Sequence, residues 1–263
     1  MLIQIVCIVF YLFAAGWVTS RLFHHQGPNP KLMIIPAFLA LTTHLYRLIE
    51  ALNQAPGANM SMLNVASLIA WLVTVTMTVA SFALATAILM PVVFGFSALI
   101  VLLGALIPEV HIMQIQLQPD LVIHITLALL AYGCLIIAVL YALQLAYINE
   151  RLKQKKTSLL HSSLPPLMTV ETIFFKLLLA GTILLTLSLI SGFVFLDNMW
   201  AKEQAHKTIL SVIAWIIFSV TAIGHHKWGW RGKPVISATL VGAFLLTLAY
   251  FGSRFVKEVI LGS

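Results

Sequence analysis

Three histidines lie within or beside long apolar segments, where an ionisable side chain is costly and often functional. His44 is followed by Arg47 and Glu50 at intervals of three residues, which places all three on roughly one face of a helix. His124 and His225 lie near the ends of two later apolar segments. A functional interpretation makes His44 a ligand or a proton-handling group.

Each of these histidines also has a purely structural interpretation. His44 could be a packed side chain that is hydrogen-bonded to a neighbouring helix, and His124 could cap the start of its helix at the membrane interface. His225 precedes a tryptophan-rich basic segment, Lys227 to Lys233, which is typical of an interfacial anchor. The other histidines are predicted to lie in solvated loops: His24, His25, His111, His161 and His206.

Motifs for hydrolysis, phosphoryl transfer and covalent haem attachment are absent from the sequence. It contains no G-x-x-x-x-G-K-[ST], H-E-x-x-H, G-x-S-x-G or C-x-x-C-H pattern. Cys7 and Cys134 fall inside apolar segments and are expected to be packing residues. We therefore expect a binding protein rather than an enzyme, and no catalytic residue is assigned.

The composition requires a lipid environment for the elements that carry these residues. Of the 263 residues, 61% are apolar and only 9% are charged, whereas soluble domains carry about 25% charged residues. The formal net charge of +7 does not indicate nucleic-acid binding, because the basic residues are divided among loops that flank the apolar segments. The expected partner of the chain is therefore the lipid bilayer.

Eight apolar segments are long enough to be transmembrane helices, which predicts an all-α, polytopic helix bundle in a single membrane domain, 1–263. The first segment lacks a positively charged start, so we interpret it as a retained helix rather than a signal peptide. Ten Lys and Arg residues fall on one side of the predicted membrane and four on the other, which predicts that both termini are outside. The predicted spans are 2–20, 33–52, 62–84, 87–107, 121–148, 175–196, 208–225 and 234–256.

Several segments together resemble the CcsA/CcmC-type cytochrome c assembly family. The resemblance extends over about 35–256 and is similar to the compact eight-helix branch of HemX-like and YpjD-type inner membrane proteins. The order in which the matching segments follow one another is more specific than any single segment. These elements are Asn64 to Leu68, Ile123 to Gly133, Lys207 through Trp215 to His225, Gly229-Trp230-Arg231-Gly232-Lys233, and Ala249 to Ser253.

The resemblance implies a protein of the bacterial inner membrane that binds haem non-covalently, with haem b as the expected cofactor. By position, His124 matches an external histidine of the relatives and His225 matches a membrane histidine. Trp200 is the one candidate stacking residue where the relatives have W-G-x-x-W-x-W-D, and the second external histidine has no counterpart. Other membrane proteins of cytochrome maturation, or of another complex, are the expected protein partners.

Physical reasoning adds a possible haem site in the outer half of the membrane. His44 and His124 would ligate the iron, and Arg47 or Arg254 would pair with a haem propionate. Two alternatives remain at this point: a regulatory or scaffolding protein that keeps the fold without the ligand, and a small transporter lined by His44, Arg47 and Glu50. The transporter ranks last because the sequence shows no inverted repeat.

Overall fold

In the residues that it describes, the computed structural model has eight α-helices and three very short strands. The residues that it describes are 2–22, 30–54, 57–84, 86–107, 112–113, 119–154, 166–195 and 202–252. The chain divides into two compact units, unit 1 (1–114 and 150–166) and unit 2 (115–149 and 167–263). The single membrane domain remains a prediction, and each unit is described by itself.

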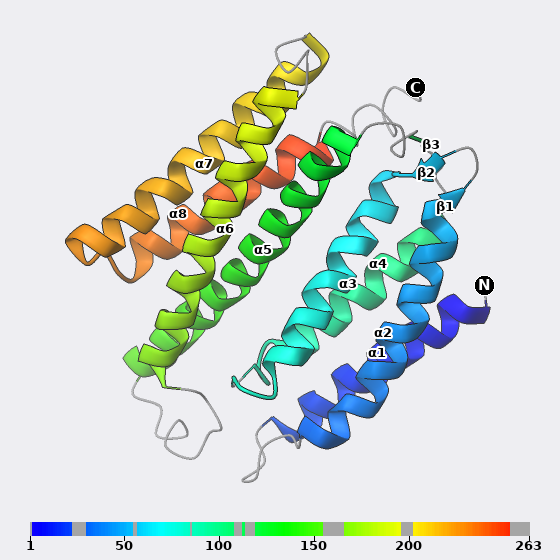
Figure 1. The fold of residues 1–263 in the computed structure, drawn as a ribbon. Helices are drawn as coiled ribbons and strands as arrows, with labels where there is room; N and C mark the ends of the chain where they lie inside the picture. Colours follow the sequence, from blue (N-terminus) through cyan, green and yellow to red (C-terminus); the bar gives the residue numbers. More distant parts are fainter. Residues whose placement is uncertain are drawn as a thin grey trace. The chain divides into compact units, whose positions relative to one another are not determined.

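Unit 1 contains four helices that run alternately up and down (Figure 1). They are α1 (Leu2–Arg21), α2 (Pro30–Leu52), α3 (Met62–Ala80) and α4 (Met90–Leu106). The strands β1 (Asn53–Gln54), β2 (Gly57–Asn59) and β3 (Ile112–Met113) form a small antiparallel sheet. Ser61 caps α3 by accepting a hydrogen bond from the Asn64 backbone N–H, and the Asn64 side chain donates to the Asn59 carbonyl. These bonds fix the start of α3, which carries Ser67.

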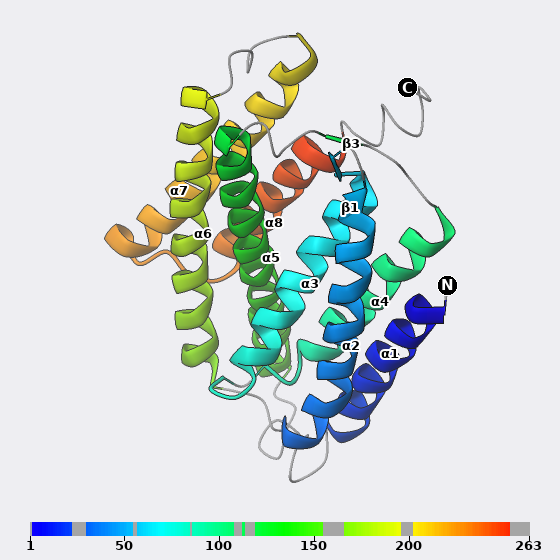
Figure 2. The same cartoon turned by 45° about the vertical axis from the view of Figure 1, so that its right-hand side comes forward.

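Unit 2 is built from the four remaining helices (Figure 2). They are α5 (Pro119–Lys153, up to Asn149 in this unit), α6 (Leu167–Phe195), α7 (Lys202–Trp228) and α8 (Lys233–Thr247), which continues as a π-helical turn, η3 (Leu248–Gly252). A glycine permits close packing of α5 and α6, because a Cβ atom on Gly181 would lie 2.8 Å from the Leu135 side chain. Gly242 similarly makes room for the ring of Phe218 between α7 and α8.

The surface of the helices is strongly apolar, as a lipid-facing surface must be. Large apolar side chains remain widely exposed, among them Phe38 at 63%, Val194 at 67% and Phe244 at 63%. Within the described ranges, seven helices are long and apolar enough to cross a membrane, and α4 is apolar but somewhat shorter. The predicted all-α, multi-pass membrane fold is confirmed, whereas the side on which the termini lie remains a prediction.

The eight predicted spans correspond to the eight helices, with differences at their ends. The largest difference is at α6, which begins at Leu167 rather than near residue 175. Its first two turns include Glu171, whose carboxylate lies 3.3 Å from Arg231. A search for apolar segments excludes such a polar turn, although the backbone there is helical.

Candidate functional site

His44 is completely buried inside unit 1, and both of its ring nitrogens are hydrogen-bonded. Nδ1 lies 2.8 Å from the Tyr11 hydroxyl of α1, and Nε2 lies 2.8 Å from the Ser67 hydroxyl of α3. The Tyr11 ring also meets the imidazole edge to face, at 5.7 Å between ring centroids. An iron atom could bind His44 only after one of these two hydrogen bonds broke.

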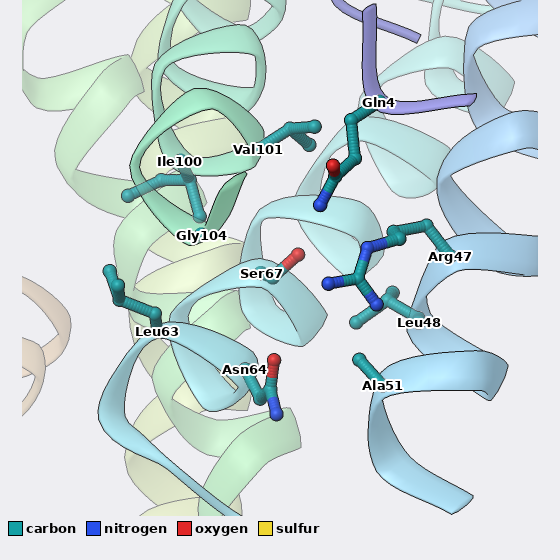
Figure 3. Close-up of a pocket in the computed structure, with 10 residues that line it drawn as sticks. All are labelled: Gln4, Arg47, Leu48, Ala51, Leu63, Asn64, Ser67, Ile100, Val101 and Gly104. Atoms are coloured by element: carbon teal, nitrogen blue, oxygen red, sulfur yellow. The ribbon is translucent and has the colours of Figure 1, made fainter. Parts of the chain in front are cut away.

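Arg47 lies one turn beyond His44 on α2 and contributes to a small pocket in unit 1. Figure 3 shows its guanidinium group pointing toward the space between Gln4 of α1 and the start of α3. The Arg47 side chain is 29% exposed, and one of its terminal nitrogens lies 3.9 Å from the carboxylate of Glu50. The predicted grouping of Arg47 with Glu50 is therefore present, but as a long ion pair near the helix end.

His124 of α5 is held by α6 through one nitrogen only. Nδ1 lies 3.0 Å from the Ser188 carbonyl oxygen and 3.2 Å from the Ser191 hydroxyl. A carbonyl oxygen can only accept, so Nδ1 carries the proton and Nε2 keeps its lone pair. Within the described residues Nε2 has no hydrogen-bond partner, which is the state that a metal ligand requires.

His225 shows the same arrangement at the junction of α7 and α8. Its Nδ1 donates to the Trp230 carbonyl oxygen over 2.9 Å, and its ring stacks on Phe175 of α6 with centroids 3.2 Å apart. The tight connection depends on Gly229 and Gly232, whose φ angles of 65° and 75° favour glycine. His225 is therefore more than an exposed anchor, because two separate contacts fix the plane of its ring.

His124 and His225 are too far apart to bind one iron atom. His124 contacts α6 at Ser188, and His225 contacts the same helix at Phe175. Thirteen residues of helix separate these contacts, which corresponds to about 20 Å along the axis. The predicted pairing of His44 with His124 joins residues of different units and remains a prediction.

Other predicted residues fall outside the part of the chain that the structure describes. These are Trp200, Arg254 and the histidines at 24, 25, 111 and 161. His206 is exposed, but the prediction of a loop was wrong there, because α7 begins at Lys202 and includes it. Across the described ranges, no three His, Cys, Asp or Glu side chains group closely enough to hold a metal ion.

The sequence reasoning missed the residues that orient the histidines. Ser188 and Ser191 are small polar residues one turn apart on α6, where they face His124. Two polar residues at that spacing in an apolar helix could have indicated a hydrogen bond to a neighbouring helix. Phe175 gave no such signal, because an aromatic residue in a membrane helix is ordinary.

Comparison with known proteins identifies the relatives of this arrangement. The family model described as "Cytochrome C assembly protein" matches residues 32–261. The chain belongs to the cytochrome c assembly protein family. The predicted family resemblance is thereby confirmed over nearly the whole chain.

Individual members of the cytochrome c assembly family differ in how much of the chain they match. "Inner membrane protein YpjD" of Escherichia coli is 35% identical, over 97% of this chain and 98% of YpjD. "Cytochrome c biogenesis protein CcsA" of Prochlorococcus marinus is 27% identical, over 51% of this chain and 50% of that protein. No solved structure matches the chain significantly. The name of YpjD and the seven candidate spans confirm the predicted multi-pass location in the bacterial inner membrane.

Proposed function

We propose that this cytochrome c assembly family protein binds haem non-covalently through membrane histidines and takes part in handling haem for cytochrome c maturation. The observation that carries the proposal is the arrangement of His124. Its Nδ1–H is fixed by the Ser188 carbonyl and the Ser191 hydroxyl, which leaves Nε2 as an oriented donor. The family supports the choice of haem as the ligand.

The surroundings of His124 fit an iron porphyrin. Histidines that bind metals usually donate their other ring N–H to a carbonyl or carboxylate, and this bond sets the tautomer and the orientation. The Ser188 carbonyl provides that bond, and α5 and α6 offer apolar side chains such as Ile123 and Ile190 against which a porphyrin could pack. Haem bound there would supply a redox-active iron, and the chain itself would bind and orient it without covalent catalysis.

His225 is proposed as a second, separate haem ligand. Its Nδ1 is bonded to a backbone carbonyl, as in His124, and the stacked ring of Phe175 restricts its rotation. Because about 20 Å of helix separates the two contacts, each histidine would bind its own haem or need a second axial ligand from elsewhere. The absence of a C-x-x-C-H sequence favours haem b, which is not covalently attached.

The test is the absorption spectrum of the detergent-purified protein, oxidised and reduced with dithionite. We expect a Soret band and sharp reduced peaks in the wild type, partly decreased in His124→Ala and in His225→Ala and lost when both are replaced. His206→Ala is the matched control, because it removes an exposed histidine from α7. A colourless wild type that also fails to bind added haem would refute the proposal. Loss of the spectrum in folded His44→Ala would instead support the pair His44 and His124.

One observation favours the alternative of a scaffold without haem. Both nitrogens of His44, the deepest of the three histidines in the packing, are used by Tyr11 and Ser67. Such a saturated side chain stabilises helix packing and needs no ligand. A scaffold would tolerate substitution of His124 and His225, whereas changes in the basic segment 149–171, which includes the connection between α5 and α6, would impair binding of its partners.

A further inference from the structure

A small pocket in unit 1 combines one cation with several polar groups on otherwise apolar walls. It lies where the start of α1, the end of α2, the start of α3 and the end of α4 come together (Figure 3). Its volume of about 20 Å³ has room for roughly one water-sized group, so only the end of a larger molecule could enter. The lining residues used below are Gln4, Arg47, Leu63, Ser67 and Ile100.

The positive charge of Arg47 is only weakly compensated in this pocket. With the Gln4 amide oxygen turned toward the guanidinium, that oxygen accepts from Nε at 2.8 Å and from a terminal nitrogen at 3.2 Å. Gln4 is neutral, and the acidic partner Glu50 lies 3.9 Å away with its side chain 62% exposed. An exposed ion pair at this distance contributes little. The guanidinium therefore retains the capacity to bind an anion.

A hydrogen-bonded chain supplies a second donor to the same pocket. Tyr11 and Ser67 lie 2.8 Å from the two nitrogens of His44, and Ser67 lines the pocket. In the tautomer with the His44 proton on Nε2, Tyr11 donates to Nδ1 and Nε2–H donates to the Ser67 oxygen. In this arrangement the Ser67 hydroxyl keeps its own proton for an acceptor in the pocket.

We infer that this pocket binds the carboxylate of an amphiphilic ligand, with Arg47 and Ser67 as its donors. The guanidinium is planar and matches a carboxylate with parallel N–H donors. The volume admits the carboxylate alone, so Leu63 and Ile100 on the remaining walls would contact only the carbon atoms next to it, and the rest of the ligand would lie outside the pocket. A porphyrin propionate and a fatty acid share this chemistry. If the ligand is haem, the inference rests on the proposed function. If the ligand is a fatty acid, it does not.

The experiment uses probes without iron, so that histidine ligation plays no part. Protoporphyrin IX and its dimethyl ester are titrated by porphyrin fluorescence against the full-length protein in detergent. We expect the wild type to bind the free acid about tenfold or more tightly than the diester, the effect of one charge-assisted hydrogen-bonded pair. Arg47→Gln should abolish this preference and Ser67→Ala should reduce it. Arg47→Lys, which keeps the charge, should retain part of it.

Controls separate the pocket from the rest of the protein. Arg21→Gln removes one positive charge at the other end of α1 and should preserve the wild-type preference. His124→Ala should also preserve it, even where that variant has lost haem, so the two proposals can fail separately. Displacement of the porphyrin by oleate would assign the pocket to carboxylates in general, and its absence would assign it to the porphyrin acid. Equal binding of acid and diester by the wild type, no binding of either, or an unchanged preference in folded Arg47→Gln would overturn the inference.

Discussion

Replacement of His44 by alanine should destabilise the protein strongly, because the imidazole connects three helices of unit 1. It is fully buried and hydrogen-bonded to Tyr11 of α1 and Ser67 of α3. Hydrogen bonds between membrane helices contribute about 0.6 kcal/mol each on average. Truncating a large buried side chain costs about 2–5 kcal/mol through the cavity that it leaves. We therefore expect a loss of about 3 kcal/mol.

The measurement is thermal unfolding in detergent, followed by intrinsic fluorescence. For a chain of this size, about 3 kcal/mol corresponds to a decrease of roughly 6–12 °C in melting temperature. Tyr11→Phe is the graded comparison, because it removes one hydroxyl without opening a cavity and should cost less than half as much. His206→Ala is the control, since that side chain is exposed. A His44→Ala protein that melts like the wild type would refute this account of His44 as a structural residue.

Two further predictions concern the junction of α7 and α8. Gly224→Ala should displace the Trp230 ring, which packs directly against Gly224, and should weaken the bond from His225 to the Trp230 carbonyl. The change should appear as altered tryptophan fluorescence and a lower melting temperature. Glu171→Gln should lower the melting temperature only slightly, because the arginine end of the pair is 58% exposed, although the Glu171 side chain is 15% exposed, and pairs open to solvent contribute about 0–1 kcal/mol. A large decrease in the Glu171→Gln variant would show that this ion pair is shielded from solvent.

Most of the fold could be predicted because a membrane makes the helix signal strong. Every spanning segment must satisfy its backbone hydrogen bonds internally, so eight apolar segments give eight helices. Helix ends were less predictable, as the early start of α6 at Leu167 shows. The polar residue Glu171 lowers the apolar signal there, although it lies within a regular helix and pairs with Arg231. That partner lies sixty positions later and could not be found from the local pattern.

The candidate site was predictable in its residues but not in their roles. His44 and His124 were proposed from their position in apolar segments and His225 from the family resemblance, yet what each can do depends on partners from other helices. His44 lies 33 residues from Tyr11 and 23 from Ser67 in sequence. No spacing rule connects residues at those separations, because the register between packed helices sets which side chains meet.

The hydrogen bonds at each imidazole rank the three histidines as possible iron ligands. An iron ligand needs one nitrogen held and the other open, since the held N–H fixes the tautomer and the direction of the lone pair. Among the residues that the structure describes, His124 and His225 meet this condition, each with Nδ1 held by a carbonyl, of Ser188 and Trp230 respectively. His44 does not, because both of its nitrogens are used. His44 instead has a positioning role, because the hydrogen bond at its Nε2 orients Ser67, which lines the same pocket as Arg47. Unit 2 thus presents the open nitrogens, and unit 1 presents donors for an anion.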